Sequence, residues 1–327
     1  FSLVAILYSV ANLASMGLEV DLRETIRSLR SVRVLSLTLG WSWILGPALA
    51  VLLTKVLPMS EPYATGLFIF SLAPTAPVLP LFIRKARADM SLAAAIMPLA
   101  VVSTVVLMPL LAPRLIPGLT LRSWAIGKPL LLTVLLPLVI GVAIKARAPR
   151  VAVRIFPAVK KTAGITTLLL LGVVLFLHWR ELLSALGSFG IASQVLFILG
   201  MALVPYVFGF GLTQPQRSAM ALAVCTRNGS AMLVAITAFP VIDPNLMAMI
   251  LLAVPVPLVV WLALSIFFSS RADATVEDGA TGRPAHRDHR AGRGPRHKPR
   301  DRDDVRLHGE GNPVAAERRH RPRRAPG

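Results

Sequence analysis

Long apolar stretches alternate with short polar ones over the first 270 residues of the chain. Each apolar stretch is about 20 residues long, the length at which an α-helix crosses a hydrocarbon core of ~30 Å. The pattern predicts nine spanning helices, at residues 1–16, 33–57, 61–83, 90–112, 127–145, 161–179, 189–211, 217–239 and 245–269. An all-α polytopic membrane protein is therefore expected. Because the chain opens at Phe1 inside an apolar stretch, we also expect one or more helices upstream.

The sequence changes character after residue 270. Residues 271–327 are rich in Arg, Gly, Pro, His and Asp and offer little apolar surface to bury, so this tail is predicted to be disordered. We favour a solvated tail without a role over a polybasic segment that touches anionic lipid, or over translation of a GC-rich gene out of frame. The chain thus divides into a membrane domain, residues 1–270, and a basic tail, residues 271–327.

Composition and charge agree with a membrane protein. Hydrophobic residues make up 55% of the chain, the mean hydropathy is +0.67 and the net charge is +19. Between the predicted spans, alternate loops hold 14 Lys and Arg against 5 in the others, so the richer loops are expected in the cytoplasm. This orientation predicts a cytoplasmic tail in a plasma (inner) membrane protein. It also explains the positive charge without a nucleic-acid partner.

Two predicted spans contain residues that interrupt a helix. Residues 71–80 read SLAPTAPVLP, and Pro74, Pro77 and Pro80 each lack an N–H and clash with the preceding turn. Residues 223–232 read AVCTRNGSAM, where Gly229 weakens a helix and its polar neighbours can bond locally to backbone.

The two interruptions lie at matching places. They are 151 residues apart, measured from Pro77 to Asn228, and fall in the third and eighth predicted spans. A repeat of five helices is inverted in the membrane, and interrupted spans at matching places in two halves point to a transporter binding site. The sequence therefore predicts two crossing discontinuous helices.

Arg227 is the one charge predicted deep inside a span. Its burial at the bilayer centre costs at least ~2.5 kcal/mol, so the side chain should face protein or water. One interpretation is that it recognises an anionic substrate or replaces a coupling cation with a fixed charge. The other is that it caps carbonyls at a helix break, and the sequence does not separate the two.

Four polar residues accompany Arg227 as substrate-binding candidates. Asn228 could donate to a ligand or tie the two broken helices together. Thr226 and Ser230 could instead satisfy their own helix, and Thr75 could line the first break or bond back within its helix.

Neither a metal site nor an enzyme active site is expected. Cys225 is the only cysteine, and five of the six histidines lie in the tail. No acidic residue or histidine lies deep enough in a predicted span to act as a base beside Arg227. We therefore expect no cofactor.

Four stretches of the chain resemble the bile acid:sodium symporter family. They are ASMGLEVDLRETIRSLR, APTAPVLPLFIRKARADMSLAAAI, VVSTVVLMPLLAPRLIPG and AVCTRNGSAMLVAI, which are similar to parts of the family's second, fourth, fifth and ninth helices. The resemblance implies two inverted five-helix repeats, panel and core domains, and transport by alternating access. It also implies that only the first of ten helices lies upstream.

The chain departs from this family where coupled members hold sodium. Those members carry P-G-G-T-A-S-N at the first break, where Leu79 and Pro80 here replace the polar Ser and Asn. They carry E-x-x-x-Q at the second break, where the matching residues here are Ala223 and Arg227. We therefore expect that sodium does not bind at the usual sites.

The resemblance and the charge together predict a secondary transporter for an organic anion in the lipid bilayer. A non-transporting sensor or degenerate relative is the alternative, suggested by the loss of the sodium ligands. Arsenite efflux ranks lower, because the related permeases rely on a cysteine in the first broken helix and this stretch has none.

Overall fold

Helices form nearly all of the secondary structure in the computed structural model, which describes residues 2–20, 26, 31–116, 123–177, 179–239 and 241–281. In chain order they are α1 (Ser2–Glu19), α3 (Val32–Gly40), the π-helix η1 (Trp41–Leu45), α4 (Gly46–Val56), α5 (Glu61–Leu72), α6 (Leu79–Lys85), α7 (Met90–Leu115), α8 (Ser123–Leu130), the π-helix η2 (Leu131–Leu135), α9 (Leu136–Arg147), α10 (Pro149–Leu177), α11 (Trp179–Ser184), α12 (Gly190–Val207), α13 (Gln214–Cys225), α14 (Gly229–Ile236), α15 (Pro244–Leu252) and α16 (Pro255–Thr281). Within these ranges β-type pairing is limited to one isolated bridge. The predicted all-α fold is confirmed.

Within the described residues, six helical segments are long and apolar enough to cross a membrane. They are Val32–Val56, Met90–Leu115, Ser123–Arg147, Pro149–Leu177, Gly190–Val207 and Pro244–Ala272. Large apolar side chains on their outer sides, such as Leu168 at 70% exposure and Leu203 at 61%, suit contact with lipid better than contact with water. The chain is a multi-pass membrane protein. The number of nine spans and the inverted repeat stay predictions.

The predicted basic loop at residues 145–161 is wrong, because helix runs through most of it. α9 continues to Arg147 and α10 already begins at Pro149, a residue that is well tolerated at a helix start. The early part of α10 is amphipathic: Arg150 and Arg154 are exposed, whereas Ala152 is buried. At the other end of the chain, α16 continues past residue 270 to Thr281. Residues 282–327 lie outside the described residues, so the disordered tail stays a prediction.

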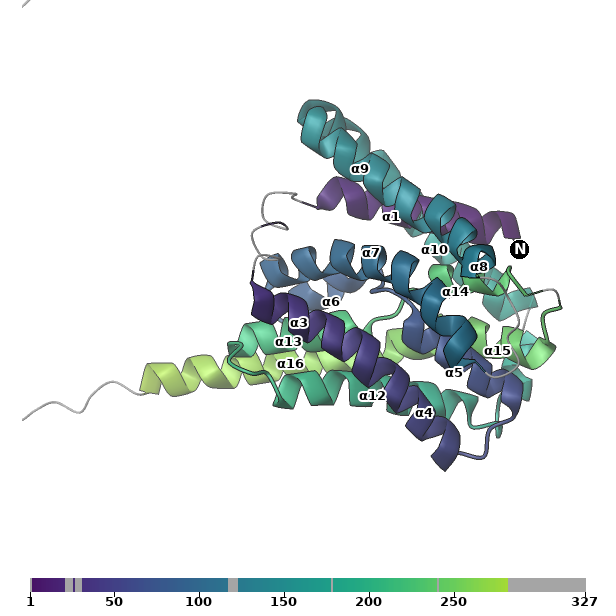
Figure 1. Cartoon of the computed structure of the whole chain (residues 1–327). Helices are drawn as coiled ribbons and strands as arrows, with labels where there is room; N and C mark the ends of the chain where they lie inside the picture. Colours follow the sequence, from purple (N-terminus) through teal and green to yellow (C-terminus); the bar gives the residue numbers. More distant parts are fainter. Residues whose placement is uncertain are drawn as a thin grey trace, which may run out of the picture. The chain divides into compact units, whose positions relative to one another are not determined.

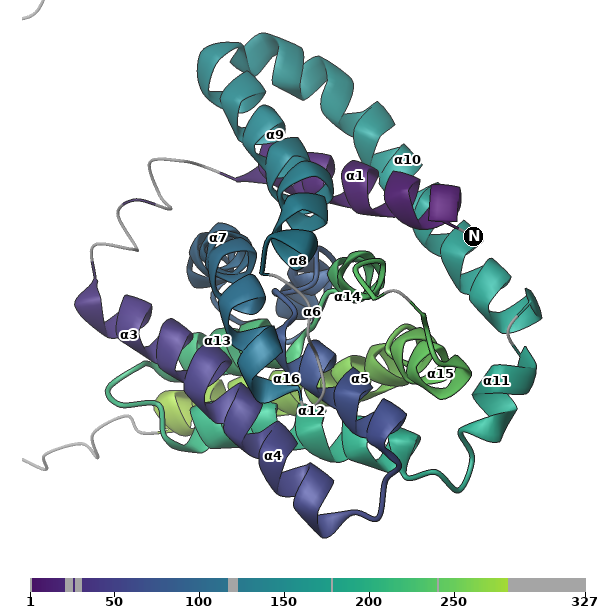
Figure 2. The ribbon, with the colours of Figure 1, turned by 45° about the vertical axis from the view of Figure 1, so that its right-hand side comes forward.

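Three helices pack together as one group. α1 lies against both α9 and α10 (Figure 1), and Figure 2 shows α9 and α10 diverging from their shared end with α1 passing across them. We call these helices the panel group. Asn12 of α1 links it to α10, because its Nδ2 donates to the Ala163 carbonyl at 3.4 Å and to Thr167 Oγ1 at 3.2 Å.

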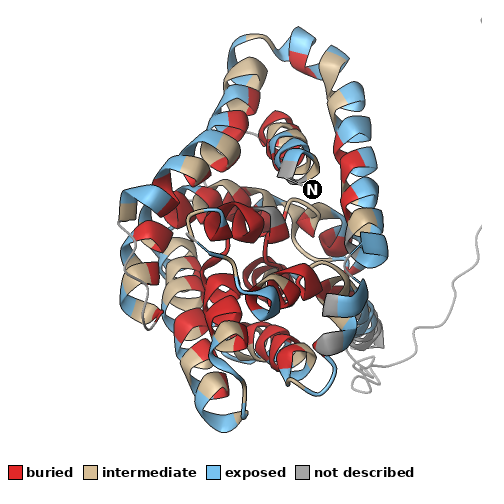
Figure 3. Cartoon of the chain, turned by 90° about the vertical axis from the view of Figure 1, so that its right-hand side faces the viewer, coloured by how far each residue is buried: buried red, intermediate tan, exposed pale blue. Residues whose placement is uncertain are grey.

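The other large group surrounds the two interrupted helices. α5 packs on α15 and α7, α6 packs on α7 and α16, and α13 packs on α12 and α7. We call α5, α6, α7 and α12–α16 the core group. Figure 3 shows buried residues concentrated along its inner helices and exposed residues along the outer ones. The hydrophobic core includes Phe70, Phe197 and Met249, all at 0% exposure.

A proline in the α8–η2–α9 helix connects it to α1. Pro137 has no N–H to offer the carbonyl of Thr133, four residues earlier. That carbonyl accepts a hydrogen bond from Ser9 Oγ of α1 at 3.1 Å. The wider η2 turn ends at Leu135, two residues before Pro137, as is common where a helix accommodates an irregular residue.

Two glycines let the backbones of α1 and α9 touch. A Cβ atom added to Gly141 would lie 2.6 Å from the Ala14 carbonyl oxygen and 3.0 Å from the Cα of Gly17. Small residues at such crossings are how membrane helices approach closely, because lipid supplies no hydrophobic drive for association. The contact therefore fixes the panel group through backbone atoms that cannot move aside.

We expect Gly141→Val to loosen the panel group, because its side chain would overlap backbone rather than a flexible side chain. Overpacking of this kind costs about 1–3 kcal/mol and should lower the unfolding temperature of the protein in detergent. Gly164→Ala is the matched control on α10, since a Cβ there meets nothing within 4 Å and Ala favours helix. An equal loss in both variants would contradict the proposed contact.

Candidate functional site

The two interrupted helices cross at their gaps. Residues 73–78 between α5 and α6, and residues 226–228 between α13 and α14, lie outside helices, so both predicted interruptions are confirmed. Thr75 of the first gap and Arg227 of the second form an antiparallel bridge. Segments about 150 residues apart in the sequence therefore meet face to face.

Backbone hydrogen bonds hold the two gaps together. The N–H of Asn228 donates to the Pro74 carbonyl at 2.8 Å, and the N–H of Ala76 donates to the Thr226 carbonyl at 3.2 Å. Each gap would otherwise leave polar backbone groups unpaired inside the membrane, at a cost of several kcal/mol apiece. The pairing satisfies these groups without water.

Side chains satisfy the carbonyls at the end of α13. The Ala223 carbonyl has no N–H partner in the helix, because the residue four positions later has left the helix. Thr75 Oγ1 donates to this carbonyl at 2.8 Å. The Cys225 carbonyl accepts from Trp261 Nε1 of α16 at 3.3 Å.

The end of α5 is capped in the same way from the other gap. Arg227 Nη1 donates to the carbonyl of Ala73, the residue that follows α5, at 2.8 Å. The two residues of the bridge therefore cap each other's helices: Thr75 caps α13, and Arg227 caps α5. This reciprocal arrangement is the central feature of the crossing.

The Arg227 side chain is buried among uncharged groups. Its exposure is 4%, and its guanidinium carbon lies 5.9 Å from the centroid of the Phe197 ring. A Cβ added to Gly46 would lie 3.3 Å from Arg227 Nη2 and 3.3 Å from the Ser71 carbonyl oxygen, so the guanidinium and that carbonyl adjoin the same glycine. Among the described residues, Arg227 Nε and Nη2 have no hydrogen-bond partner and no carboxylate pairs with the side chain.

The remaining polar candidates lie at the same crossing with different surroundings. Asn228 and Thr226 are at 0% exposure, and Thr226 Oγ1 lies 3.5 Å from the Ala223 carbonyl of its own helix. Gly229 is the first residue of α14. The side chain of Ser230 lies outside the described residues. A role of these residues in substrate binding stays a prediction.

The three prolines of the first break have different positions. Pro74 and Pro77 lie in the gap, and the Pro74 carbonyl accepts the hydrogen bond described above. Pro80 instead lies in the first turn of α6, where a missing N–H breaks no intrahelical bond. Two of the three therefore interrupt the helix, and the third begins the next one.

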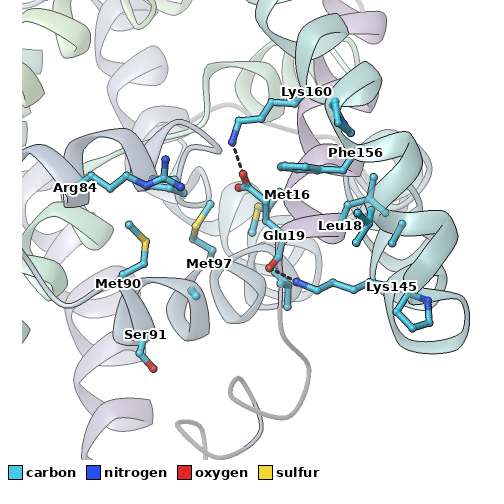
Figure 4. A pocket seen from close by; sticks show the side chains of 17 residues that line it. Met16, Leu18, Glu19, Arg84, Met90, Ser91, Met97, Lys145, Phe156 and Lys160 are labelled. Carbon is cyan, nitrogen blue, oxygen red and sulfur yellow. Dashed lines mark hydrogen bonds and ion pairs between the residues drawn. The ribbon is translucent and has the colours of Figure 1, made fainter. Parts of the chain in front are cut away.

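A cavity of about 830 Å³ opens between the panel group and the core group. Figure 4 shows charged side chains converging on it from the end of α1, from α6, and from α9 and α10. The lining residues are Met16, Leu18, Glu19, Val20, Pro80, Arg84, Met90, Ser91, Ala94, Met97, Lys145, Pro149, Ala152, Val153, Phe156, Pro157 and Lys160. Because Pro80 lies in the first turn of α6, the cavity reaches the helix that follows the first gap.

Among the described residues that line this cavity, three basic side chains and one acidic side chain give a positive balance. Lys160 Nζ forms an ion pair with Glu19 and lies 5.0 Å from the centroid of the Phe156 ring. Lys145 Nζ donates to the Glu19 backbone carbonyl at 2.6 Å. Arg84 completes the set from the end of α6.

Sequence reasoning found the crossing but missed the cavity. Arg84, Lys145 and Lys160 counted only as loop charges that set the orientation, and no sequence signal brings them together from three separate places. Trp261 and Gly46 were also missed. A tryptophan and a glycine in apolar stretches are common in membrane helices, so neither residue stands out before the helices are packed.

We expect Thr75→Val to destabilise the crossing, because it removes the shorter of the two side-chain hydrogen bonds to the buried Ala223 carbonyl and leaves only the 3.5 Å contact from Thr226 Oγ1. The loss should be about 1–3 kcal/mol, measured as a lower unfolding temperature in detergent. Thr162→Val is the control, since the Thr162 hydroxyl bonds to Ala158 within its own exposed helix turn. Equal stability of the two variants would contradict a capping role for Thr75.

Comparison with known proteins supports the resemblance seen in the sequence. The profile described as the Sodium Bile acid symporter family matches residues 6–185, which is more than half of the chain. This match includes the first break and every residue that lines the cavity, whereas the second break lies beyond it. No curated protein matches the chain. The expected family is thereby confirmed, and the chain belongs to the Sodium Bile acid symporter family of membrane transporters.

Proposed function

We propose that the protein is a secondary transporter that moves an organic anion across the plasma (inner) membrane by alternating access. The observation that carries this proposal is the cavity, whose lining combines the basic residues Arg84, Lys145 and Lys160 with apolar side chains. Its volume, about 830 Å³, lies in the range of small-molecule sites.

The lining favours an amphipathic anion. Within the described lining, three cations against one carboxylate give a net positive potential, which attracts negative substrates into a partly enclosed cleft. Met16, Met90, Met97 and Phe156 offer apolar surface, and methionine adapts to ligands of irregular shape. A carboxylate or sulfonate group on a hydrophobic body meets both requirements.

The position of the cavity suits alternating access. It lies between the panel group and α6 and α7 of the core group, so movement of one group against the other would close it on this side. Arg84, Lys145 and Lys160 also belong to the basic regions predicted to face the cytoplasm. In our proposal the cavity therefore opens to the cytoplasm, on the same side as the tail.

The crossing residues would meet substrate only in another conformation. Thr75, Thr226, Arg227 and Asn228 are buried here and are not part of the described cavity lining. Ser230 belongs to the same predicted set. Contact with them requires the cavity to extend past Pro80, and we propose such contact as a later step of the cycle.

The side chains at the crossing of this chain do not suit a sodium ion. The positions that correspond to sodium ligands in coupled relatives hold Leu79, Pro80, Ala223 and Arg227. A hard cation takes oxygen ligands, whereas these side chains are apolar or carry a positive charge. Among the described residues, no group of three or more His, Cys, Asp and Glu could hold a metal ion either. We therefore propose transport without sodium coupling at this place.

Changing the charge of the cavity should change the apparent affinity for anions. In proteoliposomes supplied with a radiolabelled bile acid and with smaller amphipathic carboxylates, Lys160→Gln should raise KM several-fold. Glu19→Gln should lower KM, because it frees Lys160 from its ion pair. Arg154→Gln is the matched control, since Arg154 is an exposed cation of α10 outside the cavity lining. Binding of these anions without flux would favour a sensor over a transporter.

Replacing sodium by another cation should not change the initial rate of substrate uptake. We expect similar initial rates in proteoliposomes when external sodium is exchanged for potassium or choline at constant ionic strength. The physical reason is that a guanidinium adjoining the site would repel a mobile cation. A collapse of uptake on sodium removal would contradict this prediction.

A further inference from the structure

A buried positive charge lies at the crossing with electron-rich groups around it. We infer that the Arg227 guanidinium is a tethered cation that fills a carbonyl-lined cation site at the carboxyl end of α5, and that removing it uncovers this site for a small monovalent cation. The inference concerns what holds the crossing together. It does not depend on which substrate the protein carries, or on whether it transports one.

The end of α5 creates a negative potential at this place. The last carbonyls of a helix lack intrahelical partners and carry together about half of a negative elementary charge. Ser71 lies in the last turn of α5, and Ala73 follows the helix directly. Although α14 begins two residues after Arg227, the guanidinium donates to Ala73 and so points to the carboxyl end of α5.

The groups nearest to the guanidinium would attract a cation and repel an anion. The Ala73 carbonyl oxygen accepts from Nη1, and the Ser71 carbonyl oxygen adjoins the same side of Gly46 as Nη2. The ring of Phe197, whose face is negative, lies 5.9 Å from the guanidinium carbon. In the conformation described here, these neighbours form the surroundings of a cation rather than of a carboxylate.

A hydrogen bond alone does not require a charge here. Trp261 caps the Cys225 carbonyl with a neutral N–H, so the crossing already contains a cap without a charge. Arg227 adds a full positive charge at 4% exposure, and its Nε and Nη2 find no partner among the described residues. The carbonyls and the ring must therefore offset the cost of burying the charge, which is the role of a bound cation.

The absence of a carboxylate partner in the described chain supports this role. Glu19 forms an ion pair in the cavity with Lys160, whereas no carboxylate of the described residues pairs with Arg227. A guanidinium without a counter-ion is stable in a buried place only where backbone dipoles neutralise it. Because the charge is covalently attached, this neutralisation cannot be lost to the solution on either side of the membrane.

Chemical rescue tests the inference directly. Arg227→Ala should lower the unfolding temperature in detergent by roughly 10 °C, because the end of α5 loses its counter-charge. Adding millimolar guanidinium, sodium or potassium chloride should raise the unfolding temperature of this variant back toward the wild-type value, and the effect should saturate. N-methylglucamine chloride should not, because its cation is too large. The wild-type protein should show no preference among the same four salts.

Arg217→Ala is the matched control. Arg217 lies on α13, the helix that precedes the gap of Arg227, and donates from Nε to a single carbonyl, that of Leu212, at 2.9 Å, but it is only partly buried and lies outside the crossing. Its variant should show no rescue that depends on the identity of the cation. Equal rescue of both variants would overturn the inference, since it would show a general effect of salt.

Two further measurements test the inference even if Arg227→Ala does not fold. Arg227→Lys retains the charge and should be more stable than Arg227→Gln, which retains only hydrogen bonding, and only the Gln variant should respond to added cations. Replacing chloride by gluconate should not change the wild-type unfolding temperature. Dependence on the anion, or an Arg227→Gln variant as stable as wild type and insensitive to cations, would overturn the inference.

Discussion

The fold depends on how two interrupted helices satisfy each other's ends. A helix that stops inside a membrane exposes carbonyls that no water can reach, so a break survives only where protein supplies donors. Here the donors are exchanged: Thr75 of the first gap caps α13, and Arg227 of the second gap caps α5. Neither break is stable without the other, so segments distant in the sequence must meet for either to form.

This exchange determines what surrounds the crossing. The two capping side chains need the gaps in one register, which the backbone bonds of Asn228 and Ala76 fix. Glycine at position 46 leaves room for the guanidinium, and Trp261 donates to the carbonyl of Cys225, the last residue of α13. The cavity then begins where α6 leaves the crossing at Pro80, so a change in the position of α6 would be transmitted to the basic lining.

The sequence predicts the elements better than their contacts. Span length and hydropathy predict the helices, and Pro74, Pro77 and Gly229 predict where two of them break, because these are local properties. The charge pattern led to the wrong prediction for residues 145–161, because exposed basic residues are as compatible with the outer face of a helix as with a loop. The partners of Arg227 could not be predicted, because a backbone carbonyl such as that of Ala73 has no signature in a sequence. The cavity was missed for the same reason: its cations lie on three separate helices and meet only after packing.

The glycine contact between α1 and α9 has a mechanical consequence. Where Gly141 meets Ala14 and Gly17, backbone touches backbone, and no side chain can change rotamer to let one helix slide past the other. α1 and α9 should therefore move together as one rigid unit within the panel group, with little bending at their contact. A large displacement of α1 relative to α9 would then have to separate the two backbones, because neither helix can slide along the other while they remain in contact.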